Sequence, residues 1–282
     1  MAGTLHVVAT PLGNLNDLSP RAREILAASA LIACEDTRRT AKLLAHCGID
    51  RPMVAVHKFS ERERLDAVLA VLARGDDVAL VSDGGTPGVS DPGALLVAAA
   101  HDAGIAVSPV PGPSAVVAIL SAAGLPADRF VFEGFLPPRA GERRKRLRAL
   151  ATEARTVVFY EAPHRVQATL ADVAEVLGGR TIVLGRELTK LHETILRGSA
   201  REVLALLGEG DVKGEIAIAL SGYDPASPIP GVGSDPLTTA WTEALASHEG
   251  DTRAALKTAA KALAIKKPEL WRRLAERGLV RD

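Results

Sequence analysis

Cysteine and aromatic residues are scarce in this sequence, and each scarcity excludes a class of protein. Only Cys34 and Cys47 occur among 282 residues, with no CxxC pair and no histidine cluster beside them. Neither a disulfide framework nor a structural zinc site is therefore expected. Aromatic residues make up 3% of the chain, which is too few for platforms on which single-stranded bases stack. We expect no resident metal ion and a reducing, cytoplasmic setting.

Net charge and long apolar runs are also lacking. Lys and Arg number 34, as do Asp and Glu, so any polyanion must be met by local basic patches. The longest apolar runs, 93–100 and 114–125, are too short to span a bilayer, and the N-terminus has no signal-peptide pattern. With 47% hydrophobic residues, the chain is long enough for two modest cores. We expect a soluble, unprocessed protein that binds no membrane.

An alternating pattern covers residues 5 to 220: short β-branched runs, then Gly/Pro/Asp loops, then longer helical stretches. This alternation predicts an α/β protein with largely parallel sheets. The expected strands are 5–9, 31–35, 53–56, 78–82, 106–110, 130–133, 156–160, 181–185, 193–196 and 215–220. Ten strands are too many for one doubly wound sheet. We therefore expect two α/β lobes, 1–124 and 125–222, with a ligand cleft between them.

The composition changes after the second expected lobe. Residues 223–235 are rich in Pro and Gly, which predicts a linker. Residues 236–282 then offer three short amphipathic helices resembling a helix-turn-helix module, with nine Lys and Arg against six Asp and Glu, a net charge of +3. The side chains expected to be buried there are Trp241, Leu245, Ala255, Leu256, Ala259, Leu263, Leu270, Trp271 and Leu274.

Three loops directly follow expected strands, at the sheet edge where open α/β proteins bind ligands. They are residues 10–15, 82–93 and 111–115. The middle loop, SDGGTPGVSDPG, holds four glycines and two prolines, so the backbone can approach a ligand without obstruction by Cβ atoms. It matches neither a triphosphate loop nor a dinucleotide fingerprint. Because it carries Asp83 and Asp91 and no Lys, it suits a cation such as a sulfonium; for any one loop, a plain tight turn is the alternative.

Eight segments of the chain together match a known family. In order they are TPLGNLNDLSPRA, ACEDTRRTAKLL, VSDGGTPGVSDPG, VPGPSAVVAILSAAGLP, FEGFLPP, FYEAPHRV, RELTKLHET and GEIAIAL. They resemble the 16S ribosomal RNA cytidine 2'-O-methyltransferase branch of the tetrapyrrole methylase superfamily over nearly the whole chain. The resemblance implies two α/β domains, S-adenosylmethionine (SAM) in the cleft between them, a homodimer, and the small ribosomal subunit as partner. TPLGNL, SDGGTPGVSDPG and the C-terminal helical module are features of this branch.

The same resemblance implies which residues contact SAM. They are Leu12, Thr86, Val89, Ser114, Ala115, Tyr160, Glu161, Glu215, Ile216 and Ala217. Thr86 stands where the wider superfamily has the Asp of a Gly-Asp-Pro loop, so it supplies a hydroxyl and backbone groups instead of a charge. We expect Asp83 to supply that charge.

A base would help the reaction, because a ribose hydroxyl is a weak acid, while the sulfonium is already an excellent leaving group. The acidic residues and the histidine just beyond strand ends are Glu35, Asp36, His57, Glu161, Glu187 and Glu193. We select Glu35, Asp36, His57 and Glu187 as catalytic candidates. The alternatives are a helix cap at Asp36 or Thr37 with Arg38 paired to Glu35, and an ordinary hydrogen-bonded histidine at position 57.

The densest basic segment is 139–148, RAGERRKRLR, with six Lys and Arg. A solvated helix face and an RNA contact are equal alternatives for this segment. Strand ends supply further cations that could grip phosphates. The residues expected to bind RNA are Arg143, Arg144, Lys145, Arg165, Arg186 and Lys190.

The leading functional expectation is a SAM-dependent ribose 2'-O-methyltransferase acting on a cytidine of small-subunit ribosomal RNA. One alternative is a methyltransferase of a small tetrapyrrole, which has no need of a basic segment or an appended helical module. Another is a DNA-binding regulator built on the C-terminal helices, with the α/β part as a ligand sensor.

Overall fold

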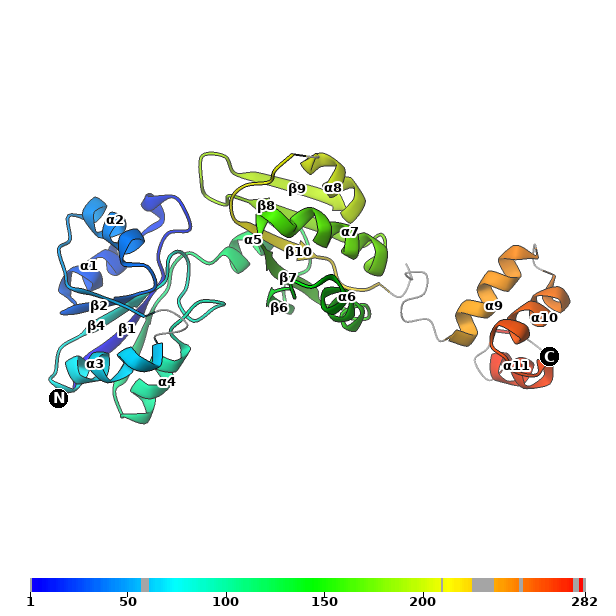
Figure 1. The fold of residues 1–282 in the computed structure, drawn as a ribbon, viewed down its shortest axis with the longest axis horizontal. Coiled ribbons are helices and arrows are strands. Elements are labelled where there is room, and N and C mark those ends of the chain that lie inside the picture. The colour runs from blue at the N-terminus through cyan, green and yellow to red at the C-terminus, as the bar shows by residue number, and fades with distance from the viewer. Residues whose placement is uncertain are drawn as a thin grey trace.

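The computed structural model describes residues 2–56, 61–208, 210–224, 236–248, 251–275 and 279–280. Two five-stranded sheets, each with its own helices, lie next to each other, and three C-terminal helices form a separate group (Figure 1). All ten expected strands are present, with ends that differ by up to three residues. In the described part of the chain, no helix is long and apolar enough to cross a membrane.

The first lobe is built on a fully parallel sheet with strand order β3-β2-β4-β1-β5. Its elements are β1 (Thr4–Val8), η1 (Leu15–Asp17), α1 (Pro20–Ala28), β2 (Leu31–Cys34), α2 (Thr37–Cys47), β3 (Met53–Ala55), α3 (Glu61–Ala73), β4 (Val78–Val81), α4 (Ala94–Asp102) and β5 (Ala106–Val110). The helices begin and end where the local chemistry predicts. Ser19 caps α1 ahead of Pro20, and Gly48 ends α2 in the left-handed conformation.

Alternating side chains of the strands face two separate apolar layers, as the period of two requires. Val78 and Leu80 of β4 pack in the layer that α3 and α4 cover, whereas Ala79 and Val81 pack in the layer of α1 and α2. Helices therefore cover both faces of the sheet. The helices leave the carboxyl ends of the strands uncovered, and the loops predicted to bind a ligand begin there.

The second lobe has a mixed sheet with strand order β6-β7-β10-β8-β9. Its elements are α5 (Ala115–Ala123), β6 (Phe130–Phe135), α6 (Ala140–Ala149), β7 (Thr156–Glu161), η2 (Pro163–Arg165), α7 (Val166–Leu177), β8 (Thr181–Arg186), β9 (Thr194–Ser199), α8 (Ala200–Leu207) and β10 (Ile216–Leu220). Only the β6–β7 pair of this sheet is parallel. The expectation of largely parallel sheets is wrong here, because the short loop between β8 and β9 can join only antiparallel neighbours.

Helix α5 belongs by its packing to the second lobe. Its buried Val116, Ile119 and Leu120 contact Val158 of β7 and other residues of the second sheet. Helices α6, α7 and α8 cover the opposite face. The junction between the lobes therefore falls in the loop before α5, earlier than the expected boundary after residue 124.

The C-terminal helices have a small core of their own. They are α9 (Pro236–Ser247), α10 (Thr252–Ala262) and α11 (Lys267–Ala275). From the expected buried set, Trp241, Ala255, Ala259, Leu270 and Leu274 are buried, and Leu245, Leu256 and Leu263 pack against them. Trp271 is partly exposed. An apolar core confined to this group is consistent with the helical module expected from the sequence.

Candidate active site between the two lobes

A cavity of about 650 Å³ lies between the strand-end loops of the two lobes, within the size range of small-molecule sites. The first lobe and the junction contribute Leu12, Arg39, Asp83, Gly84, Gly85, Thr86, Val89, Ser90, Asp91, Ser114 and Ala115. The second lobe contributes Phe135, Tyr160, Glu161, Ala162, Pro163, Leu188, Lys190, Gly214, Glu215, Ile216 and Ala217. Every residue assigned to SAM by sequence thus lines one cavity. Their contact with SAM stays a prediction.

The three loops of the first lobe hold one another in place. Thr10 and Gly85 exchange two backbone hydrogen bonds of 2.9 Å, and the Thr86 hydroxyl donates to the Pro113 carbonyl at 3.1 Å. Gly85 has a φ of +89°, and a Cβ atom there would lie 3.2 Å from Cδ2 of Leu12. The loop geometry therefore needs glycine at this position, and it leaves the backbone open to the cavity.

Residues 187–190 form the corresponding wall in the second lobe. The Glu187 carboxylate accepts hydrogen bonds from Lys190 Nζ at 2.8 Å and from the Glu215 amide at 2.9 Å. Glu187 and Thr189 both have positive φ, an uncommon conformation for residues other than glycine. The Asn14 amide of the first lobe donates to the Thr189 hydroxyl at 3.2 Å. This strained loop thus touches both lobes at the edge of the cavity.

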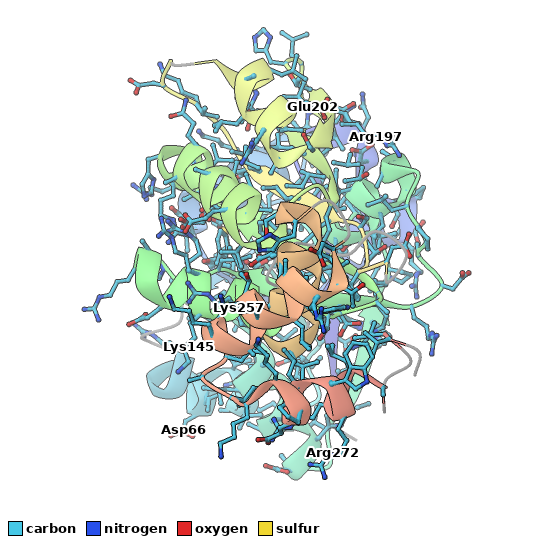
Figure 2. The ribbon with its side chains drawn as sticks, turned by 90° about the vertical axis from the view of Figure 1, so that its right-hand side faces the viewer. Asp66, Lys145, Arg197, Glu202, Lys257 and Arg272 are labelled. Atoms are coloured by element: carbon cyan, nitrogen blue, oxygen red, sulfur yellow. The ribbon has the colours of Figure 1, made fainter. Side chains whose placement is uncertain are left out.

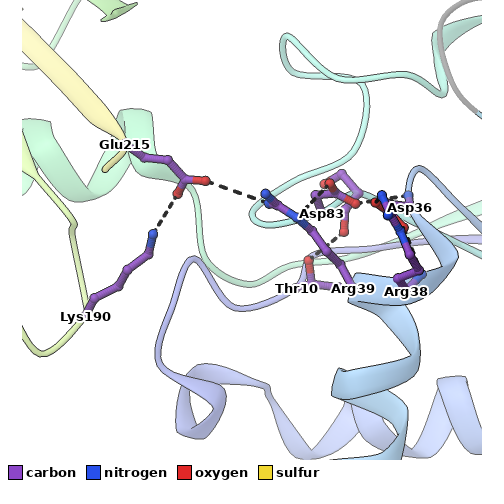
Figure 3. Close-up of polar contacts among 8 residues, drawn as sticks. Thr10, Asp36, Arg38, Arg39, Asp83, Lys190 and Glu215 are labelled. Atoms are coloured by element: carbon purple, nitrogen blue, oxygen red, sulfur yellow. Dashed lines mark hydrogen bonds and ion pairs between the residues drawn. The ribbon is translucent and has the colours of Figure 1, made fainter. Parts of the chain in front are cut away.

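Ion pairs continue across the mouth of the cavity from one lobe to the other (Figure 3). Arg39 lies 3.4 Å from the Asp83 carboxylate and 3.9 Å from the Glu215 carboxylate, which in turn lies 3.2 Å from Lys190 Nζ. Arg39 comes from α2 and Glu215 directly precedes β10. The sequence did not indicate Arg39 as a site residue, because nothing in it shows that α2 begins beside a loop of the second lobe.

The cavity lining is acidic. It holds four carboxylates, those of Asp83, Asp91, Glu161 and Glu215, against two cations, the guanidinium of Arg39 and the ammonium of Lys190. Burial and the neighbouring charge of Glu35 raise the pKa of Asp91 to about 6. Burial and Asp91 together raise the pKa of Tyr160 to about 12, so its phenol is neutral near pH 7. This excess of negative charge favours a cationic ligand.

Three of the four catalytic candidates from the sequence, Glu35, Asp36 and Glu187, lie outside the lining. Asp36 caps α2 and pairs with Arg38 at 2.7 Å, which lowers the pKa of Asp36 to about 2 and makes it a poor base. Glu35 is half-buried, and burial and Asp83 raise its pKa. The hydrogen bond from Lys190 lowers the pKa of Glu187, which holds the loop wall. His57 lies outside the described residues.

Some of the basic candidates on α6 form ion pairs with carboxylates, and others are exposed to solvent. Arg143 does not fit an RNA contact: its side chain is 5% exposed and its guanidinium lies 2.6 Å from the Asp172 carboxylate, since α6 turns this residue toward α7. Arg144 pairs with the same carboxylate and is partly exposed, whereas Lys145 is exposed (Figure 2). Arg148, which the sequence analysis did not select, is exposed as well.

The strand-end cations lie nearer to the cavity. Arg165 pairs with buried Glu161 at 2.5 Å, and Arg186 lies within 3.4 Å of the Thr194 hydroxyl. Lys190 lines the cavity. Arg165 and Arg186 each keep a buried Nε without a hydrogen-bond partner. Of the six basic candidates, the structure thus brings Arg165 and Lys190 to the cavity or to its lining residues.

The lining fits SAM in three respects. The exposed loop backbone suits a ligand with many polar atoms, and the carboxylates suit its sulfonium and ammonium groups. Apolar side chains, among them Leu12, Leu188 and Ile216, suit an adenine ring. Among the described residues, no group of three or more His, Cys, Asp and Glu is placed to hold a metal ion.

Comparison with known proteins gives consistent results. Residues 4–204 match the family model described as Tetrapyrrole (Corrin/Porphyrin) Methylases. The ribosomal RNA small subunit methyltransferase I of Xylella fastidiosa is 52% identical over 223 residues, which cover 78% of this chain and 82% of that protein. The protein of the same name from Pseudomonas aeruginosa is 48% identical over 239 residues, or 84% of this chain and 85% of that protein.

Two solved structures share the arrangement of the lobes. Uroporphyrin-III C-methyltransferase from Thermus thermophilus has a TM-score of 0.53 and 24% identity, covering 77% of this chain and 94% of that chain. A cobalt precorrin-4 methyltransferase has a TM-score of 0.57 and 17% identity, covering 79% of this chain and 96% of that chain. At these identities the likeness establishes the fold alone.

Proposed function

This chain belongs to the tetrapyrrole methylase family, and on that premise we propose that it transfers the methyl group of SAM to RNA of the small ribosomal subunit. Within that activity, we propose the ribose 2'-hydroxyl of a 16S cytidine as the acceptor. SAM supplies an electrophilic methyl group on a positively charged sulfur. The names of the curated relatives support the ribosomal substrate, and the resemblance to the cytidine 2'-O-methyltransferase branch supports the acceptor.

One observation carries the methyl-donor part of the proposal: both lobes contribute backbone and carboxylates to a single acidic cavity. Four carboxylates and two cations line it, so the lining has a formal charge of −2 when all are ionised. A site for a phosphate-rich cofactor would need the opposite balance. The fixed loops would position the donor, which supplies much of the acceleration in an in-line displacement.

The residues beyond the family match favour RNA over a small macrocycle. The matched segment ends at residue 204, and helices α9, α10 and α11 lie outside it. Residues 236–282 carry nine Lys and Arg against six Asp and Glu, so this unit would be attracted to phosphate. A tetrapyrrole substrate gives no reason for such a unit.

The test uses the full chain, SAM with a labelled methyl group, and small ribosomal subunits from a strain that lacks the corresponding gene. We expect label in 16S RNA, and mass mapping of nuclease fragments should place it on a cytidine ribose, where it blocks alkaline cleavage of the next phosphodiester. Label on a base would contradict the proposed acceptor. Label on uroporphyrinogen but not on RNA would favour the tetrapyrrole alternative, and DNA binding without turnover would favour the regulator.

A homodimer and a cytoplasmic location complete the proposal. Both rest on the family resemblance and on the ribosomal substrate. Sedimentation equilibrium of the full chain should give twice the mass of 29.5 kDa. A monomer at micromolar concentration would contradict the dimer.

A further inference from the structure

Three of the four carboxylates that line the cavity are already engaged. Asp83 accepts a hydrogen bond from the Asp36 amide at 3.0 Å and pairs with Arg39 at 3.4 Å. Glu215 lies between Arg39 and Lys190, at 3.9 and 3.2 Å.

Glu161 is fully engaged as well. It accepts from the Ala162 amide at 2.7 Å and from the Thr169 hydroxyl at 2.6 Å, and it pairs with Arg165. These partners fix the orientation of the carboxylate.

Asp91 differs from the other three. The charged groups that act on it are the carboxylates Glu35, Asp83 and Glu215, with the Tyr160 phenol on the opposite wall and the Ser82 hydroxyl nearby. No ion pair among the described residues includes Asp91, and no Lys, Arg or His is among the main influences on its pKa. An ionised carboxyl group without a cation retains a high affinity for a proton.

Backbone geometry, and not a salt bridge, positions Asp91. Ser90 before it has a φ of +66°, and Gly93 after it has a φ of +124° and packs on Leu80. The Gly88 amide donates to the Pro92 carbonyl at 3.2 Å and so closes the loop around this residue. Positive φ at Ser90 costs energy, and such strain collects at sites where a side chain must be aimed. The loop thus presents to the cavity a carboxylate that the Ser82 hydroxyl stabilises and that has no cation partner among the described residues.

We propose that Asp91 is the general base, which accepts the proton of the substrate hydroxyl as the methyl group is transferred. This assignment rests on the proposed function. The ribose oxygen forms a bond to the methyl carbon, the carbon–sulfur bond breaks, and its electron pair stays on sulfur. The hydroxyl proton passes to a carboxylate oxygen of Asp91 and then to water. Charge and atoms balance without a further reactant.

The other groups in the lining are less suited to this step. Tyr160 has a pKa of about 12 and is protonated before the reaction. Lys190 holds its proton between Glu187 and Glu215, which outweigh burial and raise its pKa. The engaged carboxylates would have to break ion pairs or hydrogen bonds to accept a proton.

The experiment separates a base from a group that merely binds SAM. Asp91→Asn is compared with Asp102→Asn, which alters an exposed carboxylate at the end of α4 outside the cavity lining. The dissociation constant of SAM is measured by calorimetry, and the rate of methyl transfer to small subunits is measured in single turnover at saturating SAM, from pH 5.5 to 8. The wild-type protein is measured first, because its failure to methylate a ribose would reject the proposed function and not this assignment.

For Asp91→Asn we expect the rate at saturating SAM to fall by about 100-fold or more. The dissociation constant of SAM should rise by about tenfold at most, since one nearby negative charge is lost. The wild-type rate should increase with pH on the acid side, and this dependence should vanish in the variant. Asp102→Asn should match the wild type in both measurements.

Two results would overturn the assignment. One is a single-turnover rate within tenfold of the wild type when Asp91→Asn is saturated with SAM. The other is a SAM affinity that falls as much as the rate does, because the carboxylate would then serve binding. SAM binding also reports whether the variant is folded. If it binds no SAM, the pH dependence of the wild-type rate decides, and a flat profile would reject Asp91 as the base.

Discussion

The guanidinium of Arg39 on α2 lies 3.9 Å from the carboxylate of Glu215, which belongs to the other lobe. The side chains are 59% and 66% exposed, so the pair contributes only about 0–1 kcal/mol to stability. We therefore expect the positive charge of Arg39 at the mouth of the cavity to affect which ligand charge the cavity prefers more than it affects the stability of the fold.

Replacement of Arg39 should accordingly change ligand preference. We expect Arg39→Gln to strengthen binding of cationic SAM relative to neutral S-adenosylhomocysteine by about two- to fivefold, with an unchanged melting temperature. Calorimetric titration with both ligands measures the ratio. Arg74→Gln, which removes an exposed arginine outside the lining, is the control. Equal changes in affinity for the two ligands would show that Arg39 affects the shape of the cavity and not its preference for a charged ligand.

Gly85 supplies a test of the loop 82–93. A Val side chain there would meet Leu12 and would have to adopt a φ of +89°, so Gly85→Val should weaken SAM binding by at least tenfold. Gly104→Val is matched for backbone strain, because Gly104 has a φ of +67° and open space around its Cβ position. Both variants should lose stability, and only Gly85→Val should lose SAM affinity. Undiminished SAM binding in Gly85→Val would remove this loop from the SAM site.

Asp91 should affect stability with a definite pH dependence. Its pKa of about 6 in the folded protein lies above the usual aspartate value of 3.8, so the ionised form is disfavoured in the folded protein. This cost is absent below about pH 4, grows as the pH rises, and is complete above about pH 6. Asp91→Asn should therefore raise the melting temperature at pH 7.5 and leave it nearly unchanged at pH 4. An equal gain at both pH values would contradict the raised pKa.

Replacement of Arg143 should lower the stability of the protein, whereas replacement of its exposed neighbours on α6 should not. Arg143→Gln leaves the buried Asp172 with one cation fewer and should destabilise the protein by about 3–5 kcal/mol, measured by urea unfolding. Lys145→Gln combined with Arg148→Gln should not change stability. If α6 contacts RNA, each of these two changes should reduce the slope of log affinity against log salt by about 0.7–0.9. An unchanged slope would leave this helix face to solvent.

Removal of the C-terminal helices should leave SAM binding intact. Among the described residues, their apolar core includes only members of the helical group itself, so we expect a chain ending at residue 235 to keep the cores of both lobes covered. We expect unchanged SAM affinity by calorimetry and weaker binding to small subunits at physiological salt. Methylation of subunits with full efficiency by the shortened chain would contradict an RNA-binding role.

The strands and the loops that line the cavity could be predicted because their signals are local. The spacing of glycine and proline predicts a loop at residues 82–93, and a short β-branched run predicts β4. The direction of β8, β9 and β10 could not be predicted in this way, because pairing depends on contacts between distant segments. The same limit applies to α5, whose apolar face fits either sheet until the packing with Val158 is known.

The sequence indicated which acidic residues lie near the cavity, but not which of them are engaged in hydrogen bonds and ion pairs. Asp36 and Glu187 lie near the cavity, yet hydrogen bonds and ion pairs with Arg38 and Lys190 engage them. The sequence indicates Asp91 only as the second acidic residue, after Asp83, of the loop 82–93. That it has no cationic partner among the described residues is apparent only from the packing of the side chains around it.

The position of β10 has a consequence for synthesis of the chain. This strand is the last of the two lobes to leave the ribosome, yet it lies between β7 and β8 in the middle of its sheet. The second sheet therefore cannot be completed in the order of translation, and pairing across this separation favours slow folding. Since Ile216 and Ala217 of β10 also line the cavity, a nascent chain shorter than about 220 residues lacks a complete site. The enzyme should gain its ligand site late, when the first lobe has had time to fold.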